Sequence, residues 1–440
     1  MHLTKIVLMV SSCFVFLTAC SYDILGSLGT YLQPSPTRMQ VALPQETEEK
    51  GKNPAVHILP SQSEPVVVPM TPTAVVSPSL ESLLGDKKTE IPAPQKPDRN
   101  LKVLPRPDIA YNDTLLVEDT LWRGEVQVTG WVTIPSHVTL TVEAGTIIRF
   151  LPDRQGENGG GILVQGRLLV NGLPDKPVTF TGAYRESAAS DWQGIVFLAT
   201  EKKNLMESSR VEWASAGLDA FHSVLSLKNV TVVDCETGFR FRDSYVSILS
   251  TAVSSCSQAI VSTDSEVEIK DASITGNRSG VSVAGGALVL SGSSLYGNDL
   301  AAVSVEKSRV KVSANSFTLN GTGLQFDSCD GAVIYNRILK NREVGLVLNN
   351  SRIKVNANEV SQNGTAGIRV THGASTLWGN SLFSNGGCAL VYNGGSVLPA
   401  MGNWWGDLPR ESIQSKICCS SEQHPVLFRP VLLSRPNLAF

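Results

Sequence analysis

The sequence is poor in charged residues, aromatic residues and histidine. Charged residues make up 18% of its 440 residues and aromatic residues 6%, and there are only six histidines. The 37 Lys and Arg residues nearly balance the 40 Asp and Glu residues, so the formal net charge is −3. Dedicated nucleic-acid binding needs a basic excess that displaces counterions from phosphates, so this balance argues against a nucleic-acid partner. No Cys-x-x-Cys pair and no Cys/His cluster at zinc spacing occurs, so we expect no metal site and no cofactor.

Hydrophobic runs of membrane-spanning length are also missing. The apolar run at residues 6–18 covers 13 residues, whereas a transmembrane helix needs about 20. It follows Lys5 and leads into Leu17-Thr18-Ala19-Cys20, which predicts a secretory signal over residues 1–19. These four residues resemble the bacterial lipobox. The resemblance implies that Cys20 is lipidated and anchors the chain in a lipid bilayer, and that Ser21 directs it to the cell outer membrane. An ordinary signal peptide with an incidental cysteine is the alternative.

Proline is concentrated in one part of the chain. Fourteen of the 23 prolines lie between Pro34 and Pro107. At this density proline removes backbone donors and fixes φ, so neither helix nor sheet can propagate. We therefore expect residues 20–108 to be a lipidated N-terminus and a disordered, Pro-rich tether. A folded domain should follow over residues 109–407, and a C-terminal cap or tail over 408–440.

The folded domain is expected to contain strands only, arranged in an internal repeat. Period-two alternation predicts strands at 126–128, 132–134, 138–142, 147–150, 162–164, 168–170, 178–180 and 195–197. Further on, a Gly or Ala before an apolar-x-apolar triplet recurs every 21 or 22 residues from Gly238 to Ala389. One polar column precedes it, and a second Asn column runs in phase. The first column is Cys235, Cys256, Asn277, Asn298, Asn320, Asn341, Asn363 and Asn385; the second is Asn315, Asn336, Asn358, Asn380 and Asn403.

A repeat of this length fits one coil of three short strands and three turns. Successive coils would stack as parallel strands about 4.8 Å apart, and each buried Asn would bond its equivalent in the next coil as a ladder. A leucine-rich repeat has a similar period, but its Leu-x-x-Leu-x-Leu signature is absent. The repeats, and the segment Gly402-Asn403-Trp404-Trp405-Gly406 that closes them, resemble the right-handed parallel β-helix of the pectate-lyase-like superfamily. The expected fold is therefore an all-β, right-handed, single-stranded parallel β-helix of about 21–22-residue coils.

The outward column of the strand after the Asn turn is a possible binding face. Its polar members are Arg240, Ser282, Ser304, Gln325 and Arg369. The resemblance implies that catalytic members of the superfamily use this face with clustered carboxylates, and between residues 240 and 391 the column has none. We therefore assign no catalytic residue.

Three other features each allow two interpretations. Asp243 and Asp264, one coil apart, are weak catalytic candidates, and an exposed loop rim is the alternative. Arg352-Ile353-Lys354 resembles a polygalacturonase tripeptide, but its companion motifs are missing, which favours a solvated strand face. Trp404 and Trp405 could stack on sugars, although capping of the open core is favoured.

The cysteines of the folded domain leave pairings open. Cys235 and Cys256 occupy the first polar column in adjacent coils, and we expect buried stacked thiols because in-register side chains point in parallel. Cys418 and Cys419 follow the repeats, where a bond to the tail or to a partner is possible.

Together these features favour a non-catalytic, membrane-anchored β-helix lipoprotein of the cell envelope. Its elongated surface would bind polysaccharide, peptidoglycan or an envelope protein. One alternative is a polysaccharide lyase or glycoside hydrolase. A second, from similarity to periplasmic copper-binding maturation proteins, is an accessory factor in metalloprotein maturation. The sequence leaves open the ligand, the periplasmic or surface orientation, and the oligomeric state.

Overall fold

The computed structural model describes residue 102 and residues 104–152, 159–419 and 425–437. The expected signal sequence, the lipidated Cys20 and the tether up to residue 101 lie outside these residues. Within the part of the chain that is described, no helix is long and apolar enough to span a bilayer.

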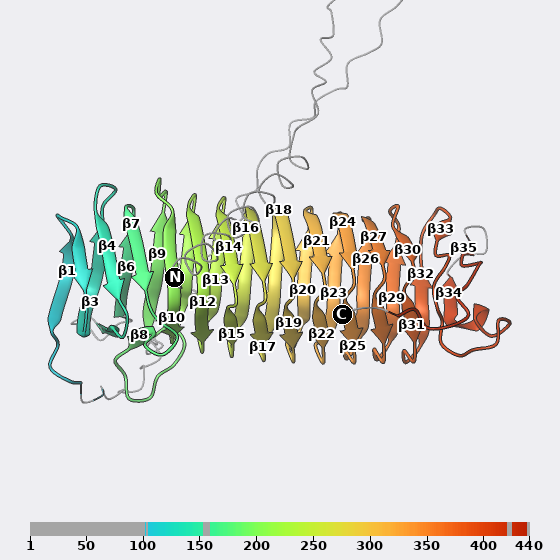
Figure 1. Cartoon of the computed structure of the whole chain (residues 1–440), viewed down its shortest axis with the longest axis horizontal. Helices are drawn as coiled ribbons and strands as arrows, with labels where there is room; N and C mark the ends of the chain where they lie inside the picture. The colour runs from blue at the N-terminus through green and yellow to red at the C-terminus, as the bar shows by residue number, and fades with distance from the viewer. Residues whose placement is uncertain (1–101, 103, 153–158, 420–424, 438–440) are drawn as a thin grey trace, which may run out of the picture. The chain divides into compact units, whose positions relative to one another are not determined.

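The folded domain is a stack of β-coils whose strands pair in parallel (Figure 1). From β12 to β29, partners in neighbouring coils are 21 or 22 residues apart, as in Arg240 with Val261 and Val347 with Arg369, whereas in the first coils the spacing varies. Each coil has three strands, and the strands form three faces. The expected all-β solenoid with coils of 21–22 residues is confirmed.

The strands are grouped by the face on which they lie. Face 1 contains β6 (Gly159–Val164), β9 (Trp192–Leu198), β11 (Ala214–Phe221), β13 (Thr237–Arg242), β20 (Ala301–Glu306), β23 (Thr322–Asp327), β26 (Val344–Asn349), β29 (Ala366–Thr371), β32 (Cys388–Tyr392) and β34 (Ile417–Cys419). Face 2 contains β2 (Thr120–Trp122), β4 (Thr139–Glu143), β7 (Arg167–Asn171), β14 (Tyr245–Leu249), β21 (Arg309–Ser313), β24 (Asp330–Ile334), β27 (Arg352–Asn356) and β30 (Thr376–Trp378). Face 3 contains β5 (Ile147–Leu151), β8 (Val178–Gly182), β15 (Ala252–Ser254), β17 (Ser273–Thr275), β19 (Ser294–Tyr296), β22 (Ser316–Thr318), β25 (Arg337–Leu339), β28 (Glu359–Ser361) and β31 (Ser381–Phe383).

The remaining strands continue around a corner or lie in the C-terminal segment. Those that turn a corner are β1 (Ile109–Leu115), β3 (Glu125–Ile134), β10 (Asn204–Glu212), β12 (Val224–Val233), β16 (Gln258–Lys270) and β18 (Ser279–Ser291). In the C-terminal segment, β33 (Leu398–Pro399) and β35 (Val426–Leu427) form a separate two-stranded sheet, and η2 (Gln414–Lys416) is a short 3-10 helix. The strands expected between residues 126 and 197 are all present, although most are longer than expected and 126–128 and 132–134 both lie in β3.

Each strand places alternate side chains inside and outside the stack. On β13, for example, Phe239 and Phe241 are fully buried whereas Arg240 and Arg242 point outward. Burying a large apolar side chain contributes about 1.5–3 kcal/mol, and the buried residues form one continuous core along the coils.

The chain turns each corner through one residue with positive φ, and the residue after it usually points inward. Lys340 has a φ of 54°, for example, and Asn341 after it is 1% exposed. Among the residues described, no β-branched residue adopts positive φ, because two groups on Cβ clash with the backbone there. The inward residues form a column at each corner. We number the corners by the faces they join: corner 1 joins faces 1 and 2, corner 2 joins faces 2 and 3, and corner 3 joins face 3 to face 1 of the following coil.

Two of these columns are the predicted Asn ladders, and both are confirmed as hydrogen-bonded chains. At corner 3, each Nδ2 donates to the next Oδ1 over 2.8–3.2 Å from Asn277 to Asn385. At corner 2, the same bonds run from Asn315 to Asn403 over 2.9–3.0 Å. Since each Asn also bonds backbone carbonyls, the ladders satisfy turn groups that would otherwise be buried without partners.

Corner 1 carries a third ladder, made of serine, which the sequence analysis did not identify. Ser223 Oγ accepts from Thr200 N, Ser244 Oγ from Ser223 N, and Ser265 Oγ from Ser244 N, over 3.0–3.2 Å. Gly286 interrupts this column; Ser308 and Cys329 take its next two positions, and Cys329 N donates to Ser351 Oγ over 3.1 Å. At each of the three corners, a buried polar side chain therefore accepts a hydrogen bond from a backbone N–H of the preceding coil. That side chain is Asn at corners 2 and 3 and Ser at corner 1.

The cysteines resolve into thiols and one disulfide. Cys235 and Cys256 are buried free thiols, as expected. The hydrogen bond with Cys256 and burial raise the pKa of Cys235 well above its ordinary value, so this thiol is a poor nucleophile. Cys418 bonds Cys388 across a Cα–Cα distance of 6.0 Å, which ties the C-terminal segment to the last coil. Cys419 is free and exposed.

Candidate functional site

The five polar residues of the expected binding face lie in one outward column of face 1. Strand pairing sets Arg240 beside Val261, then Ser282, Ser304 and Gln325, then Val347 and Arg369, one per coil. Most of these side chains are half-buried, and Gln325 is exposed. The structure thus brings them together as a straight row of hydrogen-bonding groups.

The same column continues upstream to a carboxylate, Asp219 on β11. Its Oδ2 lies 3.2 Å from Arg240 Nη1, and its Oδ1 lies 2.8 Å from Arg242 Nη2. Arg242 also lies over the Phe221 ring at 5.7 Å, and Arg240 Nη2 donates to Thr237 Oγ1. The Asp219 side chain is only 13% exposed, so one carboxylate fixes two more exposed guanidinium groups on the surface. We call Asp219, Phe221, Arg240 and Arg242 the arginine cluster.

Corner 1 next to this cluster carries the two weak catalytic candidates. Asp243 Oδ2 lies 2.8 Å from His222 Nδ1 in the preceding coil, and both side chains are more than half exposed. Asp264 leans over Gly285 in the following coil, where an added Cβ would meet its Oδ1 at 2.1 Å. The two aspartates therefore occupy equivalent corner positions but lean in opposite directions. Both have a φ of 48°, a conformation that Asp tolerates better than most residues, which gives each a structural role.

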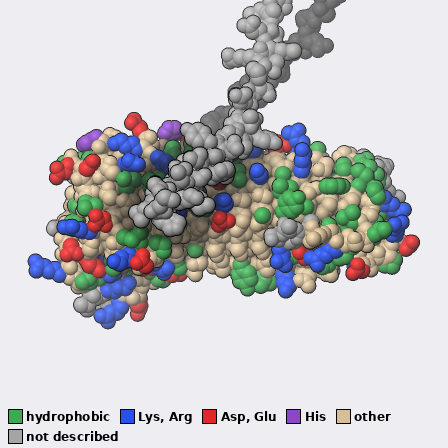
Figure 2. Space-filling view, viewed as in Figure 1, with side chains coloured by type: hydrophobic (Ala, Val, Ile, Leu, Met, Phe, Trp, Pro, Cys, Tyr) green, Lys and Arg blue, Asp and Glu red, His purple; other side chains and the backbone are tan. Residues whose placement is uncertain are grey.

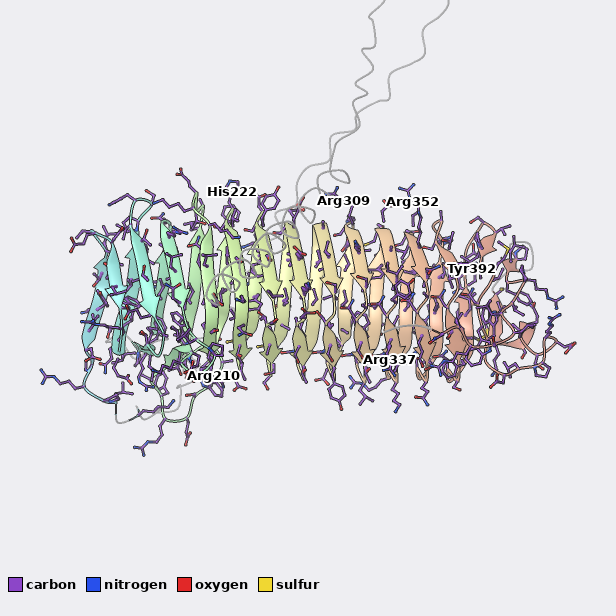
Figure 3. The ribbon with its side chains drawn as sticks, in the orientation of Figure 1. Arg210, His222, Arg309, Arg337, Arg352 and Tyr392 are labelled. Carbon is purple, nitrogen blue, oxygen red and sulfur yellow. A yellow bond between two sulfur atoms is a disulfide. The ribbon has the colours of Figure 1, made fainter. Side chains whose placement is uncertain are left out.

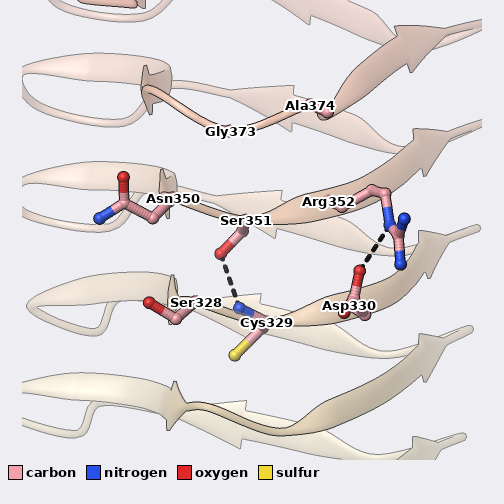
Figure 4. Close-up of a pocket in the computed structure, with 8 residues that line it drawn as sticks. All are labelled: Ser328, Cys329, Asp330, Asn350, Ser351, Arg352, Gly373 and Ala374. Atoms are coloured by element: carbon pink, nitrogen blue, oxygen red, sulfur yellow. Dashed lines mark hydrogen bonds and ion pairs between the residues drawn. The ribbon is translucent and has the colours of Figure 1, made fainter. Parts of the chain in front are cut away.

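Arg352 of the Arg-Ile-Lys tripeptide lies on face 2. His222, Arg309 and Arg352 lie along one long edge of the domain, and Arg210 and Arg337 lie along the opposite edge (Figure 3). Arg352 Nε bonds Asp330 Oδ1 at 2.7 Å beside a shallow depression of about 350 Å³ (Figure 4). Because both side chains are more than half exposed, this pair contributes little to stability. The Arg-Ile-Lys tripeptide thus lies on face 2, away from the binding face, as a solvated strand.

Trp404 and Trp405 cover the C-terminal end of the core. They are 7% and 2% exposed. Trp405 packs edge-on against Phe428, and Leu382 N donates to Trp404 O, which extends the stack by one partial coil. This burial is what the capping interpretation requires. A cavity of about 530 Å³ lies beside Trp404.

Titratable groups elsewhere do not converge on a metal site. Among the residues that the structure describes, no group of three or more His, Cys, Asp or Glu side chains is placed to hold a metal ion. Near corner 3, burial raises the pKa of Asp234, while the nearby Arg210 guanidinium acts in the opposite direction.

Two family models match the folded domain. The right handed beta helix region matches residues 257–403, and the pectate-lyase like beta helix domain matches residues 114–218. These two matches and the stack of parallel coils fit the pectate-lyase-like right-handed β-helix superfamily. No curated protein sequence matches this β-helix.

Two of the solved structures that match are those of an epimerase and a glucanase. The periplasmic alginate epimerase AlgG is 14% identical, over 68% of this β-helix chain and 78% of its own, with a TM-score of 0.28. The catalytic domain of GH87 alpha-1,3-glucanase, in complex with nigerose, is 12% identical, over 68% of this chain and 64% of its own, with a TM-score of 0.31. At these identities and TM-scores, the similarity says nothing about a substrate of this β-helix.

Two residues of this region, Asp219 and His222, are not predicted by the sequence repeat. Asp219 precedes the first clear repeat at Gly238, so the column was counted from Arg240 and its carboxylate was left out. His222 became visible only through its bond with Asp243. Counting back 21 residues from Arg240 and from Asp243 would have found both.

Proposed function

We propose that this β-helix is a non-catalytic, lipid-anchored scaffold of the cell envelope whose face 1 binds an extended polysaccharide. The observation that carries the proposal is the straight outward column from Asp219 through Arg240 to Arg369, which offers one hydrogen-bonding group in most coils. A polymer lying along the coils would meet these groups at regular steps of about 4.8 Å. Multiple weak contacts along a line give avidity without a deep pocket.

The charge distribution favours local contacts over a long-range field. Figure 2 shows acidic and basic side chains interspersed over the visible face, without an extended patch of one sign. In the arginine cluster, two guanidinium groups share one carboxylate, which leaves a local excess of positive charge. An acidic polysaccharide is therefore the preferred ligand class, and the arginine cluster is its expected strongest contact.

Membrane anchoring remains part of the proposal. Its support is the Leu17-Thr18-Ala19-Cys20 pattern, together with the Pro-rich segment between Cys20 and the folded domain. A multi-chain lipid on Cys20 would hold the protein at the outer membrane, and the tether would let face 1 reach a polymer.

The test is retention of the full-length protein in affinity electrophoresis gels that contain polygalacturonate. Wild type should be retarded, and Arg240→Ala and Arg369→Ala should each lose most of the retardation. In Arg240→Ala, Asp219 keeps Arg242 as a partner, so the fold should persist. The matched control is Lys354→Ala, because Lys354 is exposed on face 2 and should leave retardation unchanged. Equal loss in the control, or no retardation of wild type, would overturn the proposal.

An enzyme that cleaves an acidic polysaccharide is the second candidate. The observation in its favour is the bond between His222 and Asp243 beside the arginine cluster, since an Asp-oriented imidazole can transfer protons. Turnover of uronic-acid polymers should be measured with and without calcium. Turnover that is abolished by Asp243→Ala or Asp264→Ala would establish this candidate and overturn the non-catalytic one.

A further inference from the structure

The Asn ladder of corner 3 ends in two N–H groups that have no acceptor among the described residues. Inside the ladder, the backbone N–H and the Nδ2–H of one Asn converge on one oxygen. For Asn363 the distances to Asn385 Oδ1 are 3.1 and 3.0 Å. Asn385 keeps the same orientation, because its Nδ2 bonds Val360 O at 3.1 Å just as Asn363 Nδ2 bonds Ile338 O at 3.1 Å. Among the described residues no Asn takes the position one coil beyond Asn385, and no acceptor for these two donors is found there.

These donors belong to a residue that lines the C-terminal cavity of about 530 Å³. Phe383 and Trp404 form one wall, with ring centroids 5.2 Å apart. Asn385 is half-buried and contributes to the cavity lining. Two converging donors beside an aromatic wall suit a ligand with an acceptor oxygen on a flat, partly apolar body.

The charged side chains that line the cavity are Lys416, Arg435 and Asp407. Arg435 Nη2 bonds Glu359 Oε1 at 2.7 Å, and its guanidinium also lies 5.1 Å over the Phe383 ring. Lys416 is exposed and makes no ion pair with any residue of the described ranges. Because Arg435 is paired with Glu359, the Lys416 ammonium is the cation of the lining that is left to pair with a ligand, and Asp407 is its acidic side chain.

We propose that this cavity binds the carboxylate of an acidic sugar. One carboxylate oxygen accepts from both N–H groups of Asn385, in the place that the next Asn Oδ1 would take. The other oxygen faces Lys416, and the sugar ring lies against Phe383 and Trp404. Charge-assisted hydrogen bonds of this kind are stronger than neutral ones. The carboxylate follows from the cavity itself, and the choice of a sugar rests on the proposed function.

The experiment follows intrinsic tryptophan fluorescence of the full-length protein during titration, because Trp404 and Trp405 line the cavity. The probes are sodium glucuronate, glucose and sodium acetate. Glucuronate should give a saturable change, and the other two should bind at least tenfold more weakly. Glucose that binds as well as glucuronate would refute the carboxylate contact. Acetate that binds as well would refute the sugar contact.

Variants separate the cavity from the fold and from face 1. Lys416→Met should weaken glucuronate binding at least fivefold, and Asp407→Asn should strengthen it because a repelling charge is removed. Asn385→Asp should abolish it, with a thermal melt to check folding. Lys354→Met is the matched control and should bind as wild type does. Unchanged affinity in Lys416→Met, or no binding by wild type, would overturn the proposal.

The test of polysaccharide binding on face 1 can fail while the test of the cavity succeeds, and the reverse also holds. Arg240→Ala should lose retardation by polygalacturonate and keep the glucuronate response. Lys416→Met should keep retardation by polygalacturonate and lose the glucuronate response. Loss of both responses in either variant would contradict the assignment of two separate sites.

Discussion

The perturbation that tests the architecture most directly is Asn341→Leu in the middle of the corner 3 ladder. Asn341 is 1% exposed and is bonded on both sides. Its Oδ1 accepts from Asn320 N and Nδ2 at 3.1 and 3.2 Å, and its Nδ2 donates to Asn363 Oδ1 at 2.9 Å and to Phe317 O at 3.1 Å. The added bulk would also meet Gly323, where a Cβ would already lie 3.1 Å from Asn341 Nδ2.

The expected loss of unfolding free energy depends on whether each hydrogen-bond partner of Asn341 keeps another bond in the variant. Asn320 N–H loses its acceptor altogether, at a cost of about 1–3 kcal/mol for a buried orphaned group. The two bonds donated by Asn341 Nδ2 add about 0.5–1.5 kcal/mol each, because Asn363 Oδ1 still accepts from Asn341 N. The free energy of unfolding should therefore fall by about 2–6 kcal/mol, a large part of the stability of a typical domain.

The assay is urea unfolding of the full-length protein, followed by tryptophan fluorescence. Asn341→Leu should lower the midpoint at an unchanged slope with urea. The matched control is Ser282→Ala, a half-buried residue of face 1, which should change stability by less than about 0.5 kcal/mol. A midpoint for Asn341→Leu equal to that of wild type would refute the ladder as a source of stability.

Three further changes have expected outcomes. Cys20→Ser should move the protein out of the membrane fraction, and a signal-cleaved variant that stays there would contradict lipidation at this thiol. Gly160→Ala should destabilise the fold strongly, because its Cβ would lie 1.7 Å from Gly130 O. Gly395→Ala is the control, since its Cβ would meet nothing within 4 Å, and thermal melts compare the two variants. Cys388→Ser opens a link across 30 residues and should cost about 2–4 kcal/mol in urea unfolding, and a loss below 0.5 kcal/mol would show that this link does not hold the C-terminal segment.

The sequence predicts the architecture of this protein because the repeat contains Asn, which is unusual at buried positions. A buried Asn in each coil from Asn277 to Asn385, such as Asn320 and Asn341, stands out in an otherwise apolar pattern and fixes the coil length. Serine does not stand out in the same way, so the corner 1 ladder was missed, and Gly286 interrupts it. The pairing of Cys388 with Cys418 was also out of reach, because Cys418 lies beyond the repeat and has no register.

The candidate site was predicted less completely for a related reason. Its residues occupy outward positions, where no core contact constrains the side chain and the repeat leaves no signature. The column from Arg240 to Arg369 was found from register alone. The ion pairs of Asp219 depend on side-chain conformation, which the repeat does not determine. The free donors of Asn385 depend on the coil at which the stack ends, and the repeat does not predict that coil.

The uneven placement of the ladders has a mechanical consequence. The Asn ladders run from Asn277 to Asn385 and from Asn315 to Asn403, and the disulfide closes that same end, whereas the first coils have neither. A pulling force applied through the N-terminal side would enter at the end without an Asn ladder. Since each coil contacts only its neighbours, coils should peel away one at a time. Each would release about 70 Å of extended chain, so the domain would lengthen in steps under load while its C-terminal coils stay folded.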